Sequence, residues 1–391
     1  MMNLKVIGAG AAGNKAALTL IEKGFNKDNV VLLNSTRKDI PESYDGRTII
    51  FGSHRIGGCG KERDMGKQLI LNDLRNNEIS FDNIVDPDTN AVIIVSSTEG
   101  GSGSASTPIV AKYIKEVIGV PVIIVLLFGF NNDVRGMQNS IEICQELQDN
   151  YGVIGISNAK FLEQVSKNTA KAERMANEQF AKIVRIISGQ DIIPSDQNID
   201  DTDLLKIITT PGYMMVENVE IGNIKNVELC DKLIKECIDN STLVDTSKGV
   251  KRMGIIYEVE SYLYDNIDLS AGKIKDCYGI PYEIFTHLQP ESAVEGKKSN
   301  ISWIIAGAPM PIKEVEAIYN NYMENTSRVN KDFDTFFDDV SSLKGQREDG
   351  KFNMLGFEEE KISKSDFFSE FGFNDNKKSK IKKTSSNIDE Y

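Results

Sequence analysis

The chain has 391 residues and a formal net charge of −13 at pH 7. This length is enough for two or three domains with a large buried core. The negative charge disfavours broad contact with nucleic acid or anionic membrane. Five cysteines without a CxxC pair disfavour a disulfide framework and predict a reduced, cytoplasmic protein. Two histidines disfavour a histidine metal site, and no apolar run is long enough to span a bilayer.

Short apolar segments alternate with segments of helical spacing over the first third of the chain. The apolar segments are rich in β-branched residues and nearly unbroken, which is typical of parallel strands covered on both faces. We therefore expect an α/β fold with a doubly wound parallel sheet. The predicted strands are Leu4–Ile7, Val30–Leu33, Thr48–Phe51, Ala91–Val95 and Val122–Phe128, and the predicted helices are Lys15–Lys23, Lys67–Arg75 and Thr107–Ile118.

A long central helix is predicted from about Asn168 to Gly189, because its apolar residues fall on one stripe. The pattern after it is mixed and predicts a smaller α+β domain. The strands expected there are Tyr213–Ile221, Met253–Glu258, Ile284–Gln289 and Ile301–Gly307.

Apolar residues then keep a spacing of three to four from Ile312 to Leu343, which predicts a long C-terminal helix. Beyond Gly345 the composition is polar, and a lysine cluster occupies Lys377–Lys383. We expect this tail to stay disordered until a partner binds. The predicted organisation is a nucleotide-binding domain over residues 1–167, a central helix with its following loop over 168–204, the smaller domain over 205–310, and a C-terminal extension with its tail over 311–391.

A first glycine loop, Gly8–Asn14, follows a predicted strand and opens a helix. Glycines let the backbone approach a phosphate, and the helix N-terminus offers free N–H groups. The pattern matches GxGxxG and so also permits a dinucleotide-dependent oxidoreductase, although Asn34 stands where such a site normally has an acid. Glycines that serve only tight packing are a further alternative.

Two more glycine-rich segments follow strands of the same predicted sheet. The second glycine loop is Glu99–Ala105 and the third is Ile56–Lys61. Three such loops at one sheet edge predict a di- or triphosphate site, and no GxxxxGK[ST] motif is present. The candidate phosphate-binding residues are Gly10, Ala11, Ala12, Gly13, Asn14, Gly58, Cys59, Gly60, Gly100, Gly101, Ser102, Gly103 and Ser104.

These loops resemble those of the tubulin/FtsZ superfamily of GTPases. The second loop is similar to the family's GGGTG[ST]G, with Glu99 in place of the first small residue, Ser102 in place of Thr and Ala105 in place of the last Gly. The first loop closes with Gly13 and Asn14, as the family's first phosphate loop does. The resemblance implies GTP and GDP as ligands, together with Mg²⁺. Because Thr36 replaces an acid linked to Mg²⁺ in the family, the ion would be held mainly by phosphate oxygens and water.

The resemblance also implies contacts to the base and the ribose. Asn177 on the central helix matches an asparagine that reads the guanine edge, a task that suits an amide because it both donates and accepts. Asn131 and Arg135 lie in a segment similar to the family's ribose loop, with Asn131 where an acid is usual. Asn158 is a further candidate contact to base or ribose.

Asn198, Asp200 and Asp203 look like the family's NxDxxD loop. In the family this loop enters the nucleotide pocket of the next subunit, so the resemblance implies that these residues catalyse hydrolysis there. Two neighbouring carboxylates can orient a water for in-line attack. The alternative is a solvated acidic turn that caps a helix starting near Asp203.

The long C-terminal helix and lysine-rich tail make the chain most similar to the TubZ branch, which partitions plasmid or phage DNA. That resemblance implies a head-to-tail filament of this chain, no membrane partner, and a DNA-bound adaptor of the TubR kind that binds the tail at Lys377–Lys383. The alternatives are an FtsZ-like cytokinetic GTPase, an NAD(P)- or FAD-dependent oxidoreductase, and a scaffold that binds nucleotide without hydrolysing it.

Overall fold

The computed structural model describes residues 2–52, 57–147, 150–222, 224–244, 249–309 and 311–326. The expectations for the extension beyond residue 326 and for the Lys377–Lys383 cluster lie outside the described residues. Within the described ranges, no helix is both long enough and apolar enough to cross a membrane.

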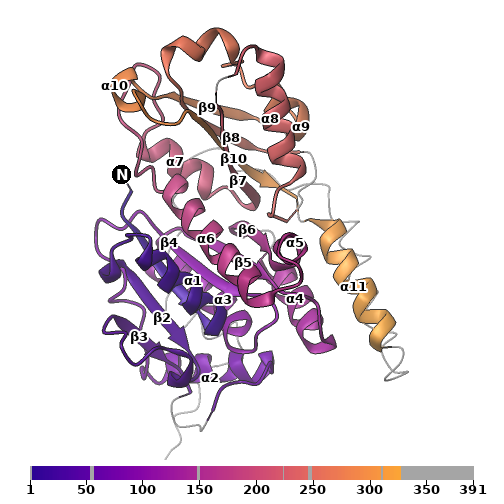
Figure 1. Ribbon diagram of the computed structural model, residues 1–391. Coiled ribbons are helices and arrows are strands. Elements are labelled where there is room, and N and C mark those ends of the chain that lie inside the picture. Colours follow the sequence, from indigo (N-terminus) through magenta and orange to yellow (C-terminus); the bar gives the residue numbers. More distant parts are fainter. Residues whose placement is uncertain are drawn as a thin grey trace, which may run out of the picture.

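The described strands form a single ten-stranded sheet in the order β3-β2-β1-β4-β5-β6-β7-β10-β8-β9 (Figure 1). Strands β3 to β7 run parallel, β10 pairs antiparallel with β7 and β8, and β9 is parallel to β8. The prediction of an α/β fold with a mainly parallel sheet is confirmed. The strands are β1 (Leu4–Ala9), β2 (Val30–Asn34), β3 (Arg47–Ile50), β4 (Ala91–Ser97), β5 (Val122–Phe128), β6 (Gly152–Ser157), β7 (Gly212–Glu220), β8 (Arg252–Glu258), β9 (Glu283–Leu288) and β10 (Asn300–Ala308).

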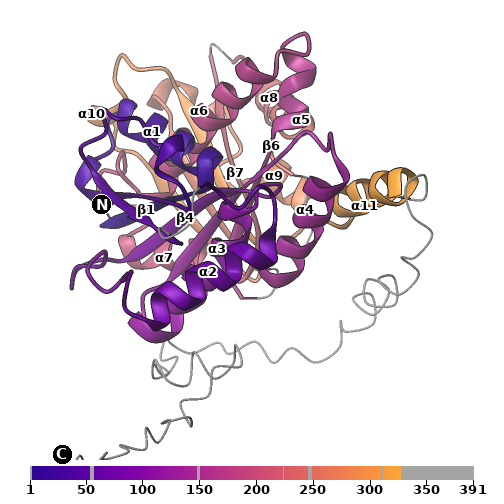
Figure 2. The ribbon, with the colours of Figure 1, turned by 90° about the horizontal axis from the view of Figure 1, so that it is seen from below.

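Helices cover both faces of the parallel part of the sheet (Figures 1 and 2). Helices α1 and α5 each pack against α6 on one face, and α2, α3 and α4 form a second layer. Helix α11 packs along the outside of α4. The helices are α1 (Gly10–Glu22), α2 (Arg63–Arg75), α3 (Ser102–Lys112), α4 (Val134–Leu147), α5 (Asn158–Gln164), α6 (Thr169–Ile187), α7 (Asp201–Ile208), α8 (Val227–Asp239), α9 (Gly272–Tyr278), α10 (Glu291–Val294) and α11 (Ile312–Thr326).

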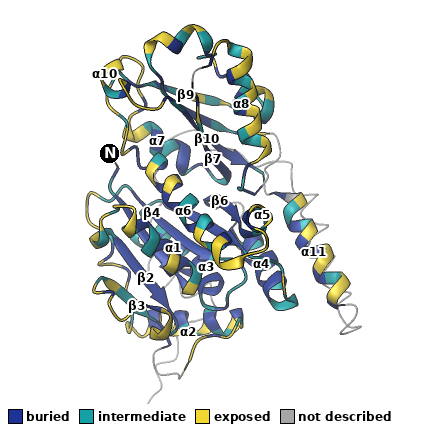
Figure 3. Ribbon diagram, in the orientation of Figure 1, coloured by how far each residue is buried: buried dark blue, intermediate teal, exposed yellow. Residues whose placement is uncertain are grey.

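The central strands are buried along almost their whole length, whereas the outer faces of the helices are exposed (Figure 3). Every residue of β1, β2, β5 and β6 is buried. This matches strands that are covered by helices on both faces and carry apolar side chains on both.

The central helix α6 runs alongside the sheet from one edge to the other. Its 19 residues span about 28 Å at 1.5 Å per residue. Its C-terminal end lies where β1 begins, because the backbone N–H of Met2 donates to the carbonyl of Ser188 at 3.2 Å. The strands β1, β2, β4 and β5 end at the opposite edge, which we call the carboxyl edge. Any group that follows α6 is therefore remote from that edge.

Three predicted helices begin earlier than expected: α2 starts at Arg63 rather than Lys67, and the other two begin inside glycine loops. Helix α1 starts at Gly10 rather than Lys15, and α3 starts at Ser102 rather than Thr107. Glycine and serine have low helix propensity and read as loop in the sequence. Here the first turn of α1 and of α3 is part of the glycine loop itself.

Candidate functional site

The three glycine loops converge at the carboxyl edge of the sheet. A Cβ atom added to Gly10 would lie 2.8 Å from the backbone nitrogen of Gly103, so the first and second loops touch backbone to backbone. A Cβ on Gly101 would lie 2.7 Å from the backbone nitrogen of Lys61, so the second and third loops also touch. These approaches leave no room for side chains and expose main-chain N–H groups instead.

Each of these loops opens a helix whose N-terminus lacks a side-chain cap. The N-cap residues of α1, α2 and α3, which are Ala9, Glu62 and Gly101, make no side-chain capping bond to the first turn. Such unsatisfied donors, together with the positive end of the helix dipole, form a binding site for an anion. Helices α5, α6, α7 and α8 are by contrast capped by side chains, namely Ser157, Asn168, Asp200 and Asn226.

Two buried asparagines at this site have amide atoms that nothing in the described protein satisfies. Both the Oδ1 and the Nδ2 of Asn14 are buried without a partner. The Nδ2 of Asn158 donates to the carbonyl of Phe128 at 2.9 Å, but its Oδ1 is also buried and unpartnered. Because an unpaired buried amide is costly, these atoms indicate a polar ligand that the two side chains would contact.

The third loop is held against the other two. The Oγ atoms of Ser35 and Ser102 lie 2.6 Å apart, which links the end of β2 to the second loop. A Cβ on Gly58 would lie 3.6 Å from the Ser35 Oγ. Cys59 is buried, as a small filler between these backbones would be. The candidate phosphate-binding residues of all three loops are therefore brought together at one place.

The expected ribose loop lies beside the second glycine loop. The N–H of Asn131 donates to the Glu99 carboxylate at 2.7 Å. Burial raises the pKa of Glu99, while that N–H and the Lys61 cation act in the opposite direction. Arg135 forms an ion pair with Glu62, and its Nε is buried without a partner. Asn131 and Arg135 thus border the site, with the Arg135 guanidinium turned to the third loop.

Asn177 lines a groove of about 650 Å³ between α1 and α6. This size is within the usual range for small-molecule sites. Lys15, directly after Asn14, forms part of the same groove and pairs with Glu173 at 3.3 Å. The groove is therefore continuous in sequence with the first glycine loop, where a base attached to bound phosphates would extend.

The residues predicted to be catalytic lie elsewhere. Asn198, Asp200 and Asp203 belong to an exposed segment, Asn198–Asp203, which we call the acid loop. The Oδ1 of Asp200 accepts from the N–H of Asp203 at 2.8 Å, and the Oδ2 of Asp203 accepts from the N–H of Asp200 at 3.4 Å. The two acids thus form a capping box for α7, which begins at Asp201 rather than near Asp203. The acid loop follows α6, so it lies at the opposite end of this helix from the glycine loops.

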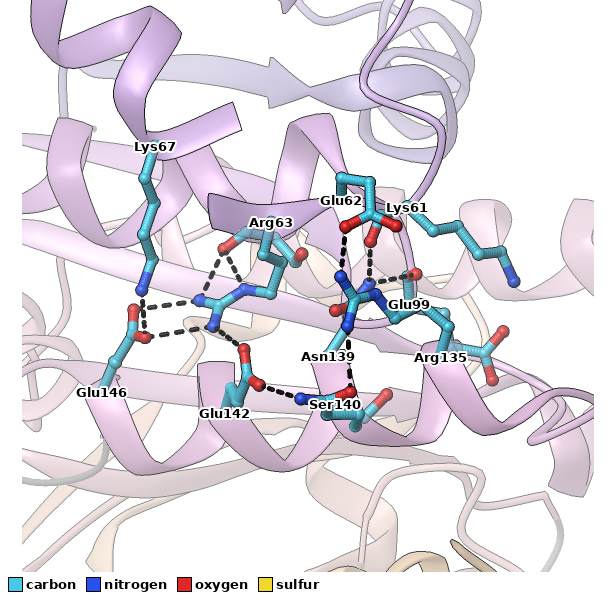
Figure 4. Close-up of polar contacts among 12 residues, drawn as sticks. Lys61, Glu62, Arg63, Lys67, Glu99, Arg135, Asn139, Ser140, Glu142 and Glu146 are labelled. Atoms are coloured by element: carbon cyan, nitrogen blue, oxygen red, sulfur yellow. Dashed lines mark hydrogen bonds and ion pairs between the residues drawn. The ribbon is translucent and has the colours of Figure 1, made fainter. Parts of the chain in front are cut away.

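The sequence did not reveal a polar network that joins the second and third loops to α4 (Figure 4). Arg63 on α2 hydrogen-bonds to Glu142 and Glu146 on α4, and Lys67 pairs with Glu146. Asn139 donates to the carbonyls of Lys61 and Glu99, each at 3.0 Å. The only sequence signal was the spacing of four between the two cations and between the two acids, which is common on exposed helices.

Comparison with known proteins agrees with this geometry. Residues 3–166 match the family described as Tubulin/FtsZ family, GTPase domain. This segment resembles a Tubulin/FtsZ GTPase domain. The match covers β1 to α5 and thus all three glycine loops and the candidate ribose loop. This match favours a GTP site over the dinucleotide site that the GxGxxG pattern of the first glycine loop would also allow.

Relatives are found among curated proteins and solved structures. Cell division protein FtsZ from Mycoplasmopsis pulmonis is 28% identical over 254 residues, which are 63% of this chain and 61% of that protein. The chain thus spans less than two thirds of the length of the curated relatives it matches. A protofilament of CetZ2 from Haloferax volcanii bound to GTPγS has a TM-score of 0.67 at 16% identity, covering 83% of this chain and all of that one. A GTPγS-form protofilament of TubZ from Bacillus thuringiensis has a TM-score of 0.66 at 15% identity, covering 84% and 93%. These two likenesses show the Tubulin/FtsZ fold.

Proposed function

We propose that this protein binds GTP in the three glycine loops and hydrolyses it within a head-to-tail filament of its own copies. One observation carries the proposal: the glycine loops and the acid loop lie at opposite ends of α6. The acids of one chain cannot reach the phosphates of the same chain across about 28 Å of helix. They can reach the phosphates of a second copy that stacks end to end.

The donor set fits a guanine nucleotide. Uncapped helix N-termini suit the phosphates, and the unpaired amides of Asn14 and Asn158 suit a polar base or sugar. Among the described residues, no cluster of three or more His, Cys, Asp or Glu side chains could hold a metal ion. We therefore expect Mg²⁺ to come with the triphosphate, where it would neutralise phosphate charge.

The acid loop is suited to positioning the attacking water. Asp200 and Asp203 lie one turn apart at the start of α7, where Asp200 is exposed and Asp203 is half-buried. Carboxylates at this separation can accept both protons of a water and align it for in-line attack. In a resting site the same charges would repel a triphosphate. Delivering them only on assembly makes hydrolysis dependent on filament formation.

The end of the molecule that bears the acid loop also exposes apolar side chains. Strand β9 holds the acid-loop segment, because Leu288 N–H donates to the carbonyl of Gln197 at 3.0 Å. Ile284 on β9 is 43% exposed, and Ile280 just before it is 87% exposed. Exposed apolar residues on and just before the strand that holds this loop support contact with a second copy.

The proposed role of the filament is to segregate plasmid or phage DNA in the cytoplasm. The structural likeness to TubZ supports this role, and the Lys377–Lys383 cluster would bind a DNA-bound adaptor of the TubR kind. A second candidate is a filament that acts in cell division, which the likeness to Cell division protein FtsZ supports. Both candidates share the same nucleotide chemistry.

The substitution Asp200→Asn tests the proposal. Asparagine caps a helix as well as aspartate does, so α7 should keep its start while the catalytic carboxylate is lost. With GTP and Mg²⁺, we expect the variant to sediment as polymer as the wild type does. Phosphate release should fall at least a hundredfold, which corresponds to loss of the positioned water.

Asp196→Asn is the matched control, because Asp196 is exposed on the same connection but lies outside the acid loop. This variant should hydrolyse GTP at the wild-type rate. Normal hydrolysis by Asp200→Asn filaments would exclude the acid loop from catalysis. Polymer with permanently intact GTP in the wild type would indicate a scaffold instead. A thermal shift with NAD or FAD but none with GTP would indicate the oxidoreductase.

A further inference from the structure

Arg63 is an arginine with almost no contact with solvent. Its side chain is 2% exposed, although it lies on α2 directly after the third glycine loop. A guanidinium has five N–H donors, and a buried one must place all of them. Here all five are used. The Nε and Nη2 donate to the carbonyl of Ser104 at 3.4 and 3.0 Å, the Nη1 donates to Glu142 and Glu146 at 2.8 and 3.0 Å, and the Nη2 also donates to Glu146 at 2.9 Å.

These bonds join three elements of the site (Figure 4). Ser104 lies in the first turn of α3, within the second glycine loop, and the two acids lie on α4. Arg63 itself begins α2, so its backbone moves with the third loop. A rigid planar fork with every donor engaged fixes the relative position of the second and third loops more tightly than a flexible lysine would.

The electrostatics support a fixed pairing between the buried Arg63 and two partly exposed acids. Burial alone would raise the pKa of Glu146, but the Arg63 and Lys67 cations lower it below its ordinary value. Buried ion pairs contribute little net stability, since removing charges from water offsets their attraction. An apolar residue could have filled this space as stably. An arginine at this place therefore points to a need for defined geometry.

We infer that Arg63 is a positioning residue that holds the third glycine loop against the second, so that the loops together bind a triphosphate better than a diphosphate. The inference rests on the proposed GTP site. Helices α1 and α3 begin after the neighbouring strands β1 and β4, and their N-termini can bind two phosphates. The third loop, with positive φ at Gly57, Gly60 and Lys61, supplies the remaining backbone donors beside Gly101. A third phosphate is the group that these donors would meet.

The test compares GTP and GDP affinity of the full chain, measured with fluorescent nucleotide analogues below the concentration at which it assembles. For Arg63→Met, we expect GTP affinity to fall at least tenfold more than GDP affinity. For Arg63→Lys, which keeps the charge but loses the fork, we expect an intermediate change in the ratio. A general loosening of the fold would lower both affinities alike.

Two controls separate positioning from stability. Arg252→Met removes another arginine that pairs with one carboxylate, Glu283, and bonds to a backbone carbonyl, but far from the loops. It should leave the ratio of affinities unchanged even where the melting temperature falls. In the double variant Arg63→Met, Glu142→Gln, the acid that loses its cation is neutralised, since Glu146 still pairs with Lys67. This variant should recover melting temperature without recovering the ratio.

The ratio of GTP affinity to GDP affinity decides whether Arg63 positions the loops. An unchanged GTP-to-GDP ratio in Arg63→Met, Arg63→Lys or the double variant would overturn it, as would recovery of the ratio together with the melting temperature. If Arg63→Met does not fold, the same affinity ratio is measured for Arg63→Lys and for the double variant. Failure of the wild type to bind GTP would instead overturn the proposed function, which this comparison detects separately.

Discussion

Asn14 shows how a single side chain can be poorly matched to the protein around it. Its amide is fully buried, yet neither its oxygen nor its nitrogen has a partner in the described structure. Leaving such a group unpaired costs about 1–3 kcal/mol. The residue is therefore better explained by a ligand than by packing.

The substitution Asn14→Leu should have opposite effects on stability and binding. Leucine has nearly the shape of asparagine and no buried polar atoms, so the free protein should become more stable by about 1 kcal/mol. GTP affinity should fall at least tenfold, because the amide no longer bonds to the nucleotide. Thermal melting without nucleotide and a binding titration measure the two effects.

Asn139→Leu provides a contrast, since the amide of Asn139 already donates to two backbone carbonyls. This variant should lose stability in the free protein. If Asn14→Leu were destabilised to the same degree and bound GTP normally, Asn14 would have no role in the site.

The sequence identified individual site residues where an uncommon residue type follows a strand. Glycines at Gly10 and Gly103, and an asparagine directly after a glycine loop, are detectable because few functions other than ligand binding require them together. Arg63 was not detectable. Its importance comes from burial and from Glu142 and Glu146, about 80 residues away, and neither is encoded in local spacing.

The helices differ in how well the sequence marks their starts. The starts of α6 and α8 are marked by capping asparagines, Asn168 and Asn226. The starts of α1 and α3 carry no such mark, and both were placed five residues late. Because these helices lack a capping residue, their first N–H groups are free to bind phosphate. The same lack removes the residue type that normally marks a helix start in a sequence.

Among the elements near the site, β6, α4 and α5 were not predicted. Strand β6 contains two glycines in six residues, and glycine weakens a strand signal. It is nevertheless fully buried between β5 and β7. Helix α4 has its apolar face against α3 and α11, and its polar residues Asn139 and Ser140 are buried in the network beside the loops. Its apolar residues Met137, Ile141, Cys144 and Leu147 keep a helical spacing of three to four, so the sequence did carry a signal for this helix.

Strand β7 carries a buried acid that makes stability depend on pH. Burial raises the pKa of Glu217 to about 7, against the opposing effects of its bond from Ser241 and the charge of Lys160. Cys237 and Tyr278 are the other titratable groups whose pKa values Glu217 raises. Because the folded state holds the proton more tightly than the unfolded chain, the contribution of Glu217 is complete below about pH 4.5 and is lost as pH rises through 7.

The substitution Glu217→Gln should remove this dependence. Glutamine resembles the protonated acid and can still accept from Ser241, so the variant should match the wild type at pH 5. At pH 8 it should be more stable by up to about 3 kcal/mol, from the shift between 4.5 and about 7. Urea unfolding at the two pH values measures the difference. Equal stability of both proteins at pH 8 would show that Glu217 ionises freely.

The whole molecule is built on a sheet whose continuity the sequence did not show. Strands β6 and β7 pair at only three positions, Gly152 with Gly212, Val153 with Tyr213 and Ile154 with Met214. This short contact joins the parallel strands to the four strands that follow α7. The sequence predicted strands in both regions, but pairing between residues 60 apart depends on register, which apolar pattern alone does not specify.

Assembly should depend on the apolar residues at the end that bears the acid loop. A lysine at Ile280 lies in solvent in the free chain, so Ile280→Lys should fold normally and bind GTP with unchanged affinity. Burying its charge against a second copy would be unfavourable, so the critical concentration for assembly should rise several-fold. Light scattering at increasing protein concentration measures this.

Leu229→Lys is the comparison, since Leu229 is exposed on α8, which packs against α9 and β7. It should leave the critical concentration unchanged. Equal effects of the two lysines would indicate a general change in solubility, and no effect of either would place the contact between copies on another surface.

Because the glycine loops and the acid loop lie at opposite ends of α6, the two tips of a head-to-tail filament are chemically different. At one tip, the last chain holds its nucleotide in loops that no neighbour covers, so this nucleotide outlasts all the others. At the other tip, the last chain presents acids with nothing to cleave. A filament of identical chains would therefore differ chemically along its length, with the intact nucleotide always at one tip.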